Sequence, residues 1–349
     1  MNYQEAKELL KTKAGNAEKW VKYVPGLEES GYLEEATKQE LMPKDAPAEQ
    51  DPNQVMTIEA LRASMGWPSR DISVNALIIE NDVADGNIPV RIYRKEALSK
   101  PVPVIVFFHG GGFFGGSLDN VEHPCRTLAD KGDVVVVSVD YSLAPEKPYP
   151  DGLLDSYRAV KWVYRNADKL GILKEKIAVA GDSAGGNLSI TVSLLDRTFG
   201  TNYIGAQVLL YPTVARGIDG KGELWDASRL GAKADAELIA GYVAGFGSLD
   251  FKVDEMYLEN QENTKNPLVS PIYSERLGEL PPTLVAVGEF DPLRLQNEVL
   301  VAQLRENGVA TEYIQYNGMI HAFMDQIGDA PQAEDVMEET VRFVLGIFK

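Results

Sequence analysis

The chain has 349 residues, 44% of them hydrophobic and 25% charged, which is ordinary for a globular protein and enough for a large core. Its formal net charge of −18 disfavours nucleic acid and anionic membranes as partners, because both would be repelled. Cys125 is the single cysteine, so no internal disulfide can form, and no secretory signal or long apolar run is found. We expect one large domain, or a domain with a lid, in the cytoplasm.

The N-terminal region is charged and loosely periodic. Residues 1–60 are predicted to form a helical arm, with apolar positions such as Leu9, Leu10 and Trp20 on one stripe. The Pro- and Asp-rich stretch at 44–54 predicts a flexible connection at the end of this arm. We expect the arm to be part of a cap over the site.

The hydrophobic pattern of the sequence changes after residue 70. Segments 73–80 and 88–94 alternate on either side of Asp85-Gly86, a pattern typical of an antiparallel pair. Short apolar runs then indicate strands that are buried on both faces. These runs lie at 103–108, 134–140, 176–182, 204–212 and 283–289.

Helical patterns separate these strands. Leu153, Tyr157, Val160 and Tyr164 form one apolar stripe, and the segments after residues 183, 294 and 332 also indicate helices. Strands that alternate with helices predict a mostly parallel sheet covered on both faces, an α/β fold. The core is expected to consist of residues 61–212 and 271–349. The polar region 213–270, with a helix near 234–246, is interpreted as a cap insertion between them.

A serine nucleophile is predicted from Gly-Asp-Ser-Ala-Gly at 181–185, which fits the pattern G-x-S-x-G. The motif follows a predicted strand and precedes a helical run, which is the setting of a nucleophile elbow. In such a turn the residues beside the strained serine press against strand and helix, so side chains do not fit there. The alternative is that Ser183 only caps the following helix.

An oxyanion hole is predicted from the sequence His-Gly-Gly-Gly at 109–112, which ends the strand at 103–108. Acyl transfer creates a negatively charged oxygen, and backbone N–H groups can stabilise it. We expect Gly111, Gly112 and Ala184 to supply those groups. A flexible glycine loop or an anion-binding nest is the alternative, although no G-x-x-x-x-G-K-[ST] motif accompanies the glycines.

The general base is predicted from chain order. His321 is the only histidine that follows Ser183, because His109 and His123 precede it. The order serine, acid, histidine is that of α/β-hydrolases.

The acid is predicted to be Asp291, which follows the strand at 283–289 and precedes a helix. Asp291 could instead cap that helix, and Glu289 is the rival acid.

Together the motifs resemble the hormone-sensitive-lipase-like family of α/β-hydrolase carboxylesterases over about residues 75–348. They are HGGG at 109–112, YSLAPE at 141–146, GDSAGGN at 181–187, LPPTLVAVGEFDPLR at 280–294 and GMIHAF at 318–323. The resemblance implies an α/β-hydrolase fold with a mostly parallel central sheet, helices on both faces and a helical cap. It also implies the triad Ser183, Asp291 and His321 and an oxyanion hole from the HGGG glycines, with no metal or organic cofactor.

Two positions depart from the family pattern. Ser142 stands where the family usually has arginine, which puts in doubt a buried contact that supports the oxyanion loop. Ala322 stands where glycine more often follows the histidine. We expect both changes to tune the activity rather than abolish it.

The resemblance implies hydrolysis of short acyl or aryl esters through an acyl-enzyme. Phe113 and Phe114 follow the oxyanion glycines and are predicted to narrow the acyl pocket, unless both rings face the core. The predicted partner is a small-molecule ester, with no nucleic acid and no membrane, and homo-oligomer formation stays open. The alternatives are amide hydrolysis and a non-catalytic small-ligand receptor on the same fold, which would lack a residue equivalent to His321.

Overall fold

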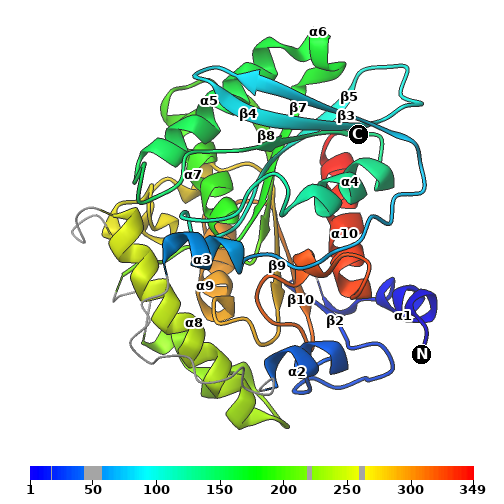
Figure 1. Ribbon diagram of the computed structural model, residues 1–349, viewed down its shortest axis with the longest axis vertical. Coiled ribbons are helices and arrows are strands. Elements are labelled where there is room, and N and C mark those ends of the chain that lie inside the picture. Colours follow the sequence, from blue (N-terminus) through cyan, green and yellow to red (C-terminus); the bar gives the residue numbers. More distant parts are fainter. Residues whose placement is uncertain (17, 43–56, 218–221, 259–263) are drawn as a thin grey trace.

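The computed structural model describes residues 1–16, 18–42, 57–217, 222–258 and 264–349. Its strands form one sheet in the order β1-β2-β10-β9-β8-β7-β5-β6-β4-β3, with helices on both faces (Figure 1). The predicted connection at 44–54 and parts of the predicted insertion, 218–221 and 259–263, lie outside the described residues. The strands are β1 (Ala14–Asn16), β2 (Lys19–Lys22), β3 (Leu77–Ala84), β4 (Ile88–Lys95), β5 (Val102–Phe108), β6 (Val135–Val139), β7 (Ile172–Asp182), β8 (Ile204–Leu210), β9 (Thr283–Gly288) and β10 (Thr311–Tyr316).

The centre of the sheet consists of parallel strands. β9, β8, β7, β5 and β6 are successive parallel neighbours, and β10 adds a further parallel strand beside β9. Every residue of β6 and β9 is buried, as expected for strands covered on both faces. The five predicted strands and the α/β class are therefore confirmed. Because the strands are parallel, the loops after β5, β7, β9 and β10 meet at one edge of the sheet.

The predicted antiparallel pair lies at the far edge of the sheet. β3 and β4 pair from Leu77↔Lys95 to Ala84↔Ile88 around the turn that contains Asp85 and Gly86. β4 then pairs antiparallel with β6 and joins the hairpin to the parallel strands. The alternating pattern of the sequence is confirmed as this hairpin.

Helices cover the two faces of the sheet (Figure 1). α4 and α10 pack against each other on one face, whereas α5 and α7 pack against each other on the other. The predicted stripe lies on α5, with Leu153, Tyr157 and Val160 buried and Tyr164 partly buried against the same cluster. The helices of the core are α4 (Glu122–Lys131), α5 (Asp151–Arg165), α6 (Ala167–Leu170), α7 (Ala184–Thr198), α9 (Arg294–Glu306) and α10 (Pro331–Ile347).

The N-terminal region differs from the expectation of a purely helical arm. α1 (Tyr3–Leu10), α2 (Glu35–Leu41) and α3 (Ile58–Ala63) are helices, but β1 and β2 between them extend the central sheet. The expectation of a cap arm over 1–60 therefore needs correction for residues 14–22. The physical reason is that β10 would otherwise leave its edge N–H and C=O groups without partners in the sheet, and β2 pairs with them in parallel.

A buried ion pair fixes β2 on the sheet. Lys22 is 1% exposed, and its ammonium group binds Asp335 and, at 2.9 Å, Glu339, both on α10. A lone buried lysine would be costly, so the two carboxylates are needed to offset its loss of hydration. The sequence did not predict β2, because a short segment that ends in lysine shows no alternation of apolar and polar residues.

The insertion contains a long helix, which lies alongside the edge of the sheet where the loops after β5, β7, β9 and β10 meet. The helix predicted at 234–246 is α8 (Ala236–Tyr257), which starts close to the expected position and continues further (Figure 1). Among the described residues, no helix combines the length and the apolar character needed to cross a membrane. The short 3-10 segments are η2 (Glu223–Trp225), η3 (Ala227–Leu230), η5 (Pro271–Tyr273), η6 (Leu277–Glu279) and η7 (Phe323–Gln326).

Candidate active site

Ser183 lies in a sharp turn between β7 and α7, with φ 52° and ψ −114°. This conformation is strained for a residue with a side chain, so the surrounding structure must impose it. A Cβ at Gly181 would overlap the Gly185 carbonyl, and a Cβ at Gly185 would overlap the carbonyl oxygen of Phe108 in β5. The Ser183 side chain makes no capping hydrogen bond to α7, so the helix-cap alternative is wrong. The turn instead holds the serine hydroxyl out at the edge of the sheet.

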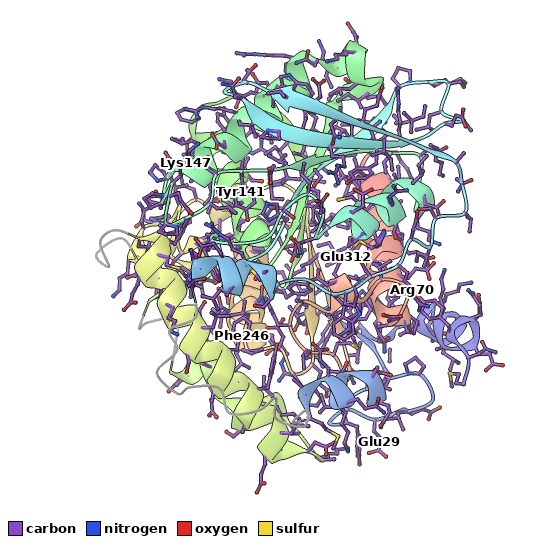
Figure 2. All side chains as sticks on the ribbon, in the orientation of Figure 1. Glu29, Arg70, Tyr141, Lys147, Phe246 and Glu312 are labelled. Carbon is purple, nitrogen blue, oxygen red and sulfur yellow. The ribbon has the colours of Figure 1, made fainter. Side chains whose placement is uncertain are left out.

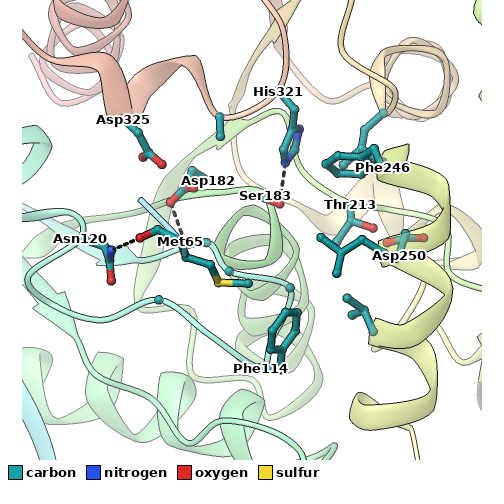
Figure 3. Close-up of a pocket in the computed structure, with 18 of the residues that line it drawn as sticks. Met65, Phe114, Asn120, Asp182, Ser183, Thr213, Phe246, Asp250, His321 and Asp325 are labelled. Carbon is teal, nitrogen blue, oxygen red and sulfur yellow. Dashed lines mark hydrogen bonds between the residues drawn. The ribbon is translucent and has the colours of Figure 1, made fainter. Parts of the chain in front are cut away.

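His321 lies between Ser183 and Asp291. Its Nε2 is 2.8 Å from Ser183 Oγ (Figure 3), and its Nδ1 is 2.9 Å from Asp291 Oδ2. The three side chains come from the loops after β7, β9 and β10, which the parallel sheet brings to one edge. The hydroxyl, imidazole and carboxylate therefore form one hydrogen-bonded chain, the arrangement that transfers a proton from a serine.

Asp291 makes hydrogen bonds in two directions, although it is not the N-cap of α9, which is Leu293. The residue is fully buried, and its Oδ1 accepts the Leu293 N–H at 2.7 Å in the turn that leads into α9. Its other oxygen, Oδ2, is the one that faces His321. One carboxylate thus stabilises the turn and orients the imidazole.

Aromatic rings enclose the imidazole of His321. Tyr211 and Phe246 each present an edge-to-face contact with ring centroids 4.8 Å away, and Phe246 comes from α8 (Figure 2). The His321 side chain is only 7% exposed. Ala322 after it has φ 62°, a left-handed conformation that favours glycine, which explains why glycine suits this position.

The other two histidines have different partners. His123 Nδ1 lies 2.9 Å from Ser69 Oγ, at the entrance of α4. His109 is buried at the start of the glycine loop, where its Nδ1 lies 2.8 Å from the Gly110 carbonyl and its ring stacks on Tyr141. Tyr141 is labelled in Figure 2. Burial lowers the pKa of His109 to about 4, so this ring is neutral at physiological pH.

Glu289, the rival acid, binds backbone rather than His321. Its two carboxylate oxygens accept the N–H groups of Gly31 at 2.7 Å and Gly318 at 2.9 Å. Burial raises the pKa of Glu289 despite these two hydrogen bonds. The carboxylate ties the N-terminal segment to the loop that carries His321.

The glycine loop after β5 lies beside Ser183 and lines the cavity. Its first N–H, from Gly110, is donated to Asp182 Oδ1 at 2.7 Å, whereas Gly111 and Gly112 line the cavity floor. The carbonyl of Gly111 accepts the N–H of Gly115 at 2.8 Å and closes a turn. A side chain at Gly111 would overlap the Gly115 carbonyl, so this turn requires glycine there. Ala184 is the first residue of α7, where helix N–H groups have no partner within the helix.

A cavity of about 240 Å³ opens over Ser183 (Figure 3). Phe114 forms part of its wall, but Phe113 is buried with its ring stacked on Tyr257 at a centroid distance of 3.9 Å. Both rings are thus buried in one core cluster, and of the two Phe114 also lines the cavity. Other side chains around the cavity are Met65, Asn120, Val121, Asp182, Thr213, Arg216, Phe246, Leu249, Asp250, Val253, Leu293 and Asp325.

Two carboxyl groups on the cavity wall hold protons more tightly than usual. Burial raises the pKa of Asp182 to about 6, against the opposing effects of the Gly110 N–H and of His321. Burial and the nearby charge of Asp182 raise the pKa of Asp325 well above its usual range. Among the described residues, no group of three or more His, Cys, Asp or Glu side chains is arranged to hold a metal ion.

A buried charge cluster fastens α8 over the cavity and was missed in the sequence. Arg216, which is 2% exposed and follows β8, binds Asp250 and, at 2.6 Å, Asp254, both on α8. The two aspartates lie beyond the helix predicted at 234–246, and their arginine partner could not be identified from the sequence. Met65 and Asn120 were also missed, because neither belongs to a motif.

Comparison with known proteins places the chain in a family. The family model for the alpha/beta hydrolase fold matches residues 105–325. An arylesterase of Saccharolobus solfataricus is 36% identical over 240 residues, which are 69% of this chain and 74% of that protein. Carboxylesterase NlhH of Mycobacterium tuberculosis is also 36% identical, over 241 residues that cover 68% of this chain and 72% of that protein.

The solved structures agree with these relatives. A hyperthermophilic esterase from the archaeon Pyrobaculum calidifontis superposes with a TM-score of 0.71 at 30% identity and covers 90% of this chain and 99% of that one. A structure described as an arylesterase gives a TM-score of 0.68 at 31% identity, over 84% of this chain and 90% of that one.

Proposed function

Since the chain belongs to the hormone-sensitive-lipase-like family of α/β-hydrolases and is a carboxylesterase, we propose that it cleaves short acyl or aryl esters with the triad Ser183, His321 and Asp291. The observation that carries this proposal is the placement of His321 within hydrogen-bond distance of both Ser183 Oγ and Asp291 Oδ2. A non-catalytic receptor would have no use for this proton pathway.

The acylation step begins when Ser183 Oγ attacks the ester carbonyl carbon. His321 Nε2 takes the hydroxyl proton as the C–O bond forms, and the carbonyl electron pair moves onto the oxygen. The N–H groups of Gly111, Gly112 and Ala184 stabilise that oxyanion. Asp291 keeps Nδ1 protonated and stabilises the imidazolium that forms. The tetrahedral intermediate then collapses, and His321 gives its proton to the departing alcohol.

Deacylation repeats the same steps with water. His321 removes a proton from a water molecule as its oxygen attacks the acyl carbon, and the oxyanion donors act a second time. The carboxylic acid leaves when Ser183 Oγ recovers the proton from His321. The ester and one water molecule together supply the protons found in the alcohol and acid products.

The size and lining of the cavity support short substrates. Its volume is about 240 Å³, and Phe114, Phe246, Leu249 and Val253 present apolar surface around the nucleophile. Apolar walls favour the hydrocarbon part of an acyl or aryl group, while bulky rings shorten the space available to a long chain. We propose that α3 with the residues after it, together with α8, forms the cap. We also propose a cytoplasmic location, which the lone Cys125 supports.

The test is a panel of p-nitrophenyl esters from acetate to palmitate, with anilides as an amide control. We expect turnover to peak below decanoate and Ser183→Ala to reduce it by several orders of magnitude in a folded protein. His321→Ala should have the same effect, whereas His123→Ala, whose ring binds Ser69, should retain turnover. An inactive His123 variant beside an active His321 variant would refute the assignment of the base.

A further inference from the structure

The loop that carries Gly111 and Gly112 is held from outside by α3. Arg62 on this helix donates from Nε to the Phe114 carbonyl at 2.6 Å and from Nη2 to the Ala144 carbonyl at 2.9 Å. Phe114 lies in the turn that the Gly111 carbonyl closes. One guanidinium therefore binds the oxyanion loop and the neighbouring turn at 144–146 at the same time.

The remaining donors of Arg62 face Glu146. Nη1 and Nη2 form a two-point ion pair with its carboxylate, at 2.8 and 2.6 Å. The planar fork of arginine permits this set of bonds, which a single ammonium group could not reproduce. The Glu146 side chain is 57% exposed, so the ion pair itself contributes little, and its effect is to aim the guanidinium.

The turn at 144–146 is also attached to the loop directly. The Ala144 N–H donates to the carbonyl of Phe113 at 2.9 Å, so two adjacent loop carbonyls, at Phe113 and Phe114, both have donors. Ser142, where an arginine could have stood, instead binds Asp155 through its hydroxyl and its N–H. Arg62 thus supports this loop from α3, a helix that precedes β3 in the chain.

α3 is itself anchored to the core. Ile58, Leu61 and Met65 pack against the buried cluster that contains Phe113 and Phe114. The Met65 carbonyl accepts a hydrogen bond from Asn120 at 3.2 Å, and Thr57 Oγ1 caps the helix by accepting the Ala60 N–H at 3.3 Å. Arg62 therefore lies on a short helix whose position is fixed by apolar packing against the core and by these hydrogen bonds.

We infer that Arg62 is a positioning residue for the oxyanion hole: its hydrogen bonds to Phe114 and Ala144 set the orientation of the N–H groups of Gly111 and Gly112. Oxyanion donors act only when they lie at hydrogen-bond distance from the oxygen in the transition state, so a small rotation of the loop weakens them. The ground-state ester carbonyl depends on them less. This inference rests on the proposed function, because it assumes an oxyanion at these two glycines.

The test compares Arg62→Met with Glu146→Gln. The first removes both hydrogen bonds to the loop and the turn. The second removes the charge of the ion pair but keeps a carbonyl oxygen that accepts from the guanidinium, and it leaves the bonds to Phe114 and Ala144 in place. With p-nitrophenyl butyrate we expect Arg62→Met to lower kcat roughly ten-fold or more with little change in KM, and Glu146→Gln to stay within about two-fold of wild type. The affinity for an alkyl trifluoromethyl ketone, which forms an oxyanion on the serine, should fall in parallel with kcat.

Arg62→Lys is included in case Arg62→Met does not fold. It keeps the charge but only one donor centre, so kcat and trifluoromethyl ketone affinity should both lie between those of Arg62→Met and wild type. Arg62 variants that match Glu146→Gln in both measurements would overturn the inference, as would a loss of kcat with unchanged inhibitor affinity. A wild-type enzyme that neither turns over the ester nor binds the inhibitor would instead refute the proposed function.

Discussion

The carboxylate of Glu289 accepts the backbone N–H of Gly318 at 2.9 Å, three positions before His321 in the chain. Its other oxygen accepts the N–H of Gly31 from the N-terminal segment. The two acids that compete in the sequence, Glu289 and Asp291, therefore act on the same loop in different ways. Asp291 binds the imidazole, and Glu289 holds the backbone that carries it.

This division predicts opposite effects for two matched substitutions. Glu289→Gln places an amide NH₂ against one of two N–H donors, so it should cost about 1–3 kcal/mol of stability and reduce kcat by less than ten-fold. Asp291→Asn can still accept the Leu293 N–H, so stability should change less, while kcat should fall by about 10⁴. Urea unfolding and steady-state kinetics on both variants measure the two effects. A larger loss of kcat for Glu289→Gln than for Asp291→Asn would contradict the assignment of the acid.

The strain at Ser183 predicts a difference between two inactive variants. Ser183→Gly should be more stable than Ser183→Ala by about 1 kcal/mol, because glycine adopts φ 52° without steric cost. This gain exceeds the extra conformational entropy that glycine adds to the unfolded chain. Thermal unfolding of the two proteins gives the comparison. Equal stability would show that the turn stores no strain at this residue.

The pKa of Asp182 predicts a pH dependence of stability. Burial raises this pKa from 3.8 to about 6, so the folded protein binds the proton more tightly than the unfolded chain. As pH rises through this window the unfolded chain loses its proton first, and the ionised carboxyl costs the folded state up to about 3 kcal/mol by neutral pH. Asp182→Asn removes this titration but keeps an acceptor for Gly110. Its stability relative to wild type should rise between about pH 4 and pH 7, and a constant difference would contradict the burial of a charged Asp182.

The two adjacent phenylalanines predict different phenotypes. Phe114→Ala should widen the cavity and shift the chain-length preference toward longer acyl groups. Phe113→Ala should leave that preference unchanged and destabilise the protein by about 3–5 kcal/mol, because its ring is buried against Tyr257. Phe114 is equally buried, so both variants should lose stability in thermal unfolding, and the ester panel is the measurement that separates them. A shifted profile for Phe113→Ala alone would reverse the assignment of the cavity wall.

The N-terminal segment predicts a graded response to truncation. Removal of residues 1–34 takes away β2, the Lys22 carbonyl that accepts the Asn317 N–H at 2.9 Å, and the Glu34 N–H that binds the Gly318 carbonyl. Asp335 would also lose its lysine partner, so stability and turnover should both fall sharply. Removal of residues 1–12 takes away only α1 and its contacts with α10, and should lower stability while turnover persists. If the shorter protein lacking 1–34 has the kinetics of the full chain, the segment has no part in holding the His321 loop.

The proposed catalytic groups could be selected from the sequence because the turn and the chain order each leave a recognisable pattern there. Gly181 and Gly185 are required where strand and helix press against the serine, and the structure shows the overlaps that a side chain would cause. His321 was the only histidine after Ser183, so chain order selected it. The buried strands were equally visible, because strands covered on both faces are apolar throughout.

What the sequence by itself determined was therefore the five central parallel strands, the β3–β4 hairpin, the helices between them and the sharp turn at Ser183, together with the side chains proposed for hydrolysis. Only the tertiary structure decided the partners of polar groups far apart in the chain. From the sequence, Lys22 would be expected at the surface, but in the structure two carboxylates of α10 bind it. Arg62 would be expected to be an ordinary charged residue of a helix, but in the structure it donates to the carbonyls of Phe114 and Ala144. Such contacts carry no periodicity, because they form when folding removes these groups from water and each then needs a partner.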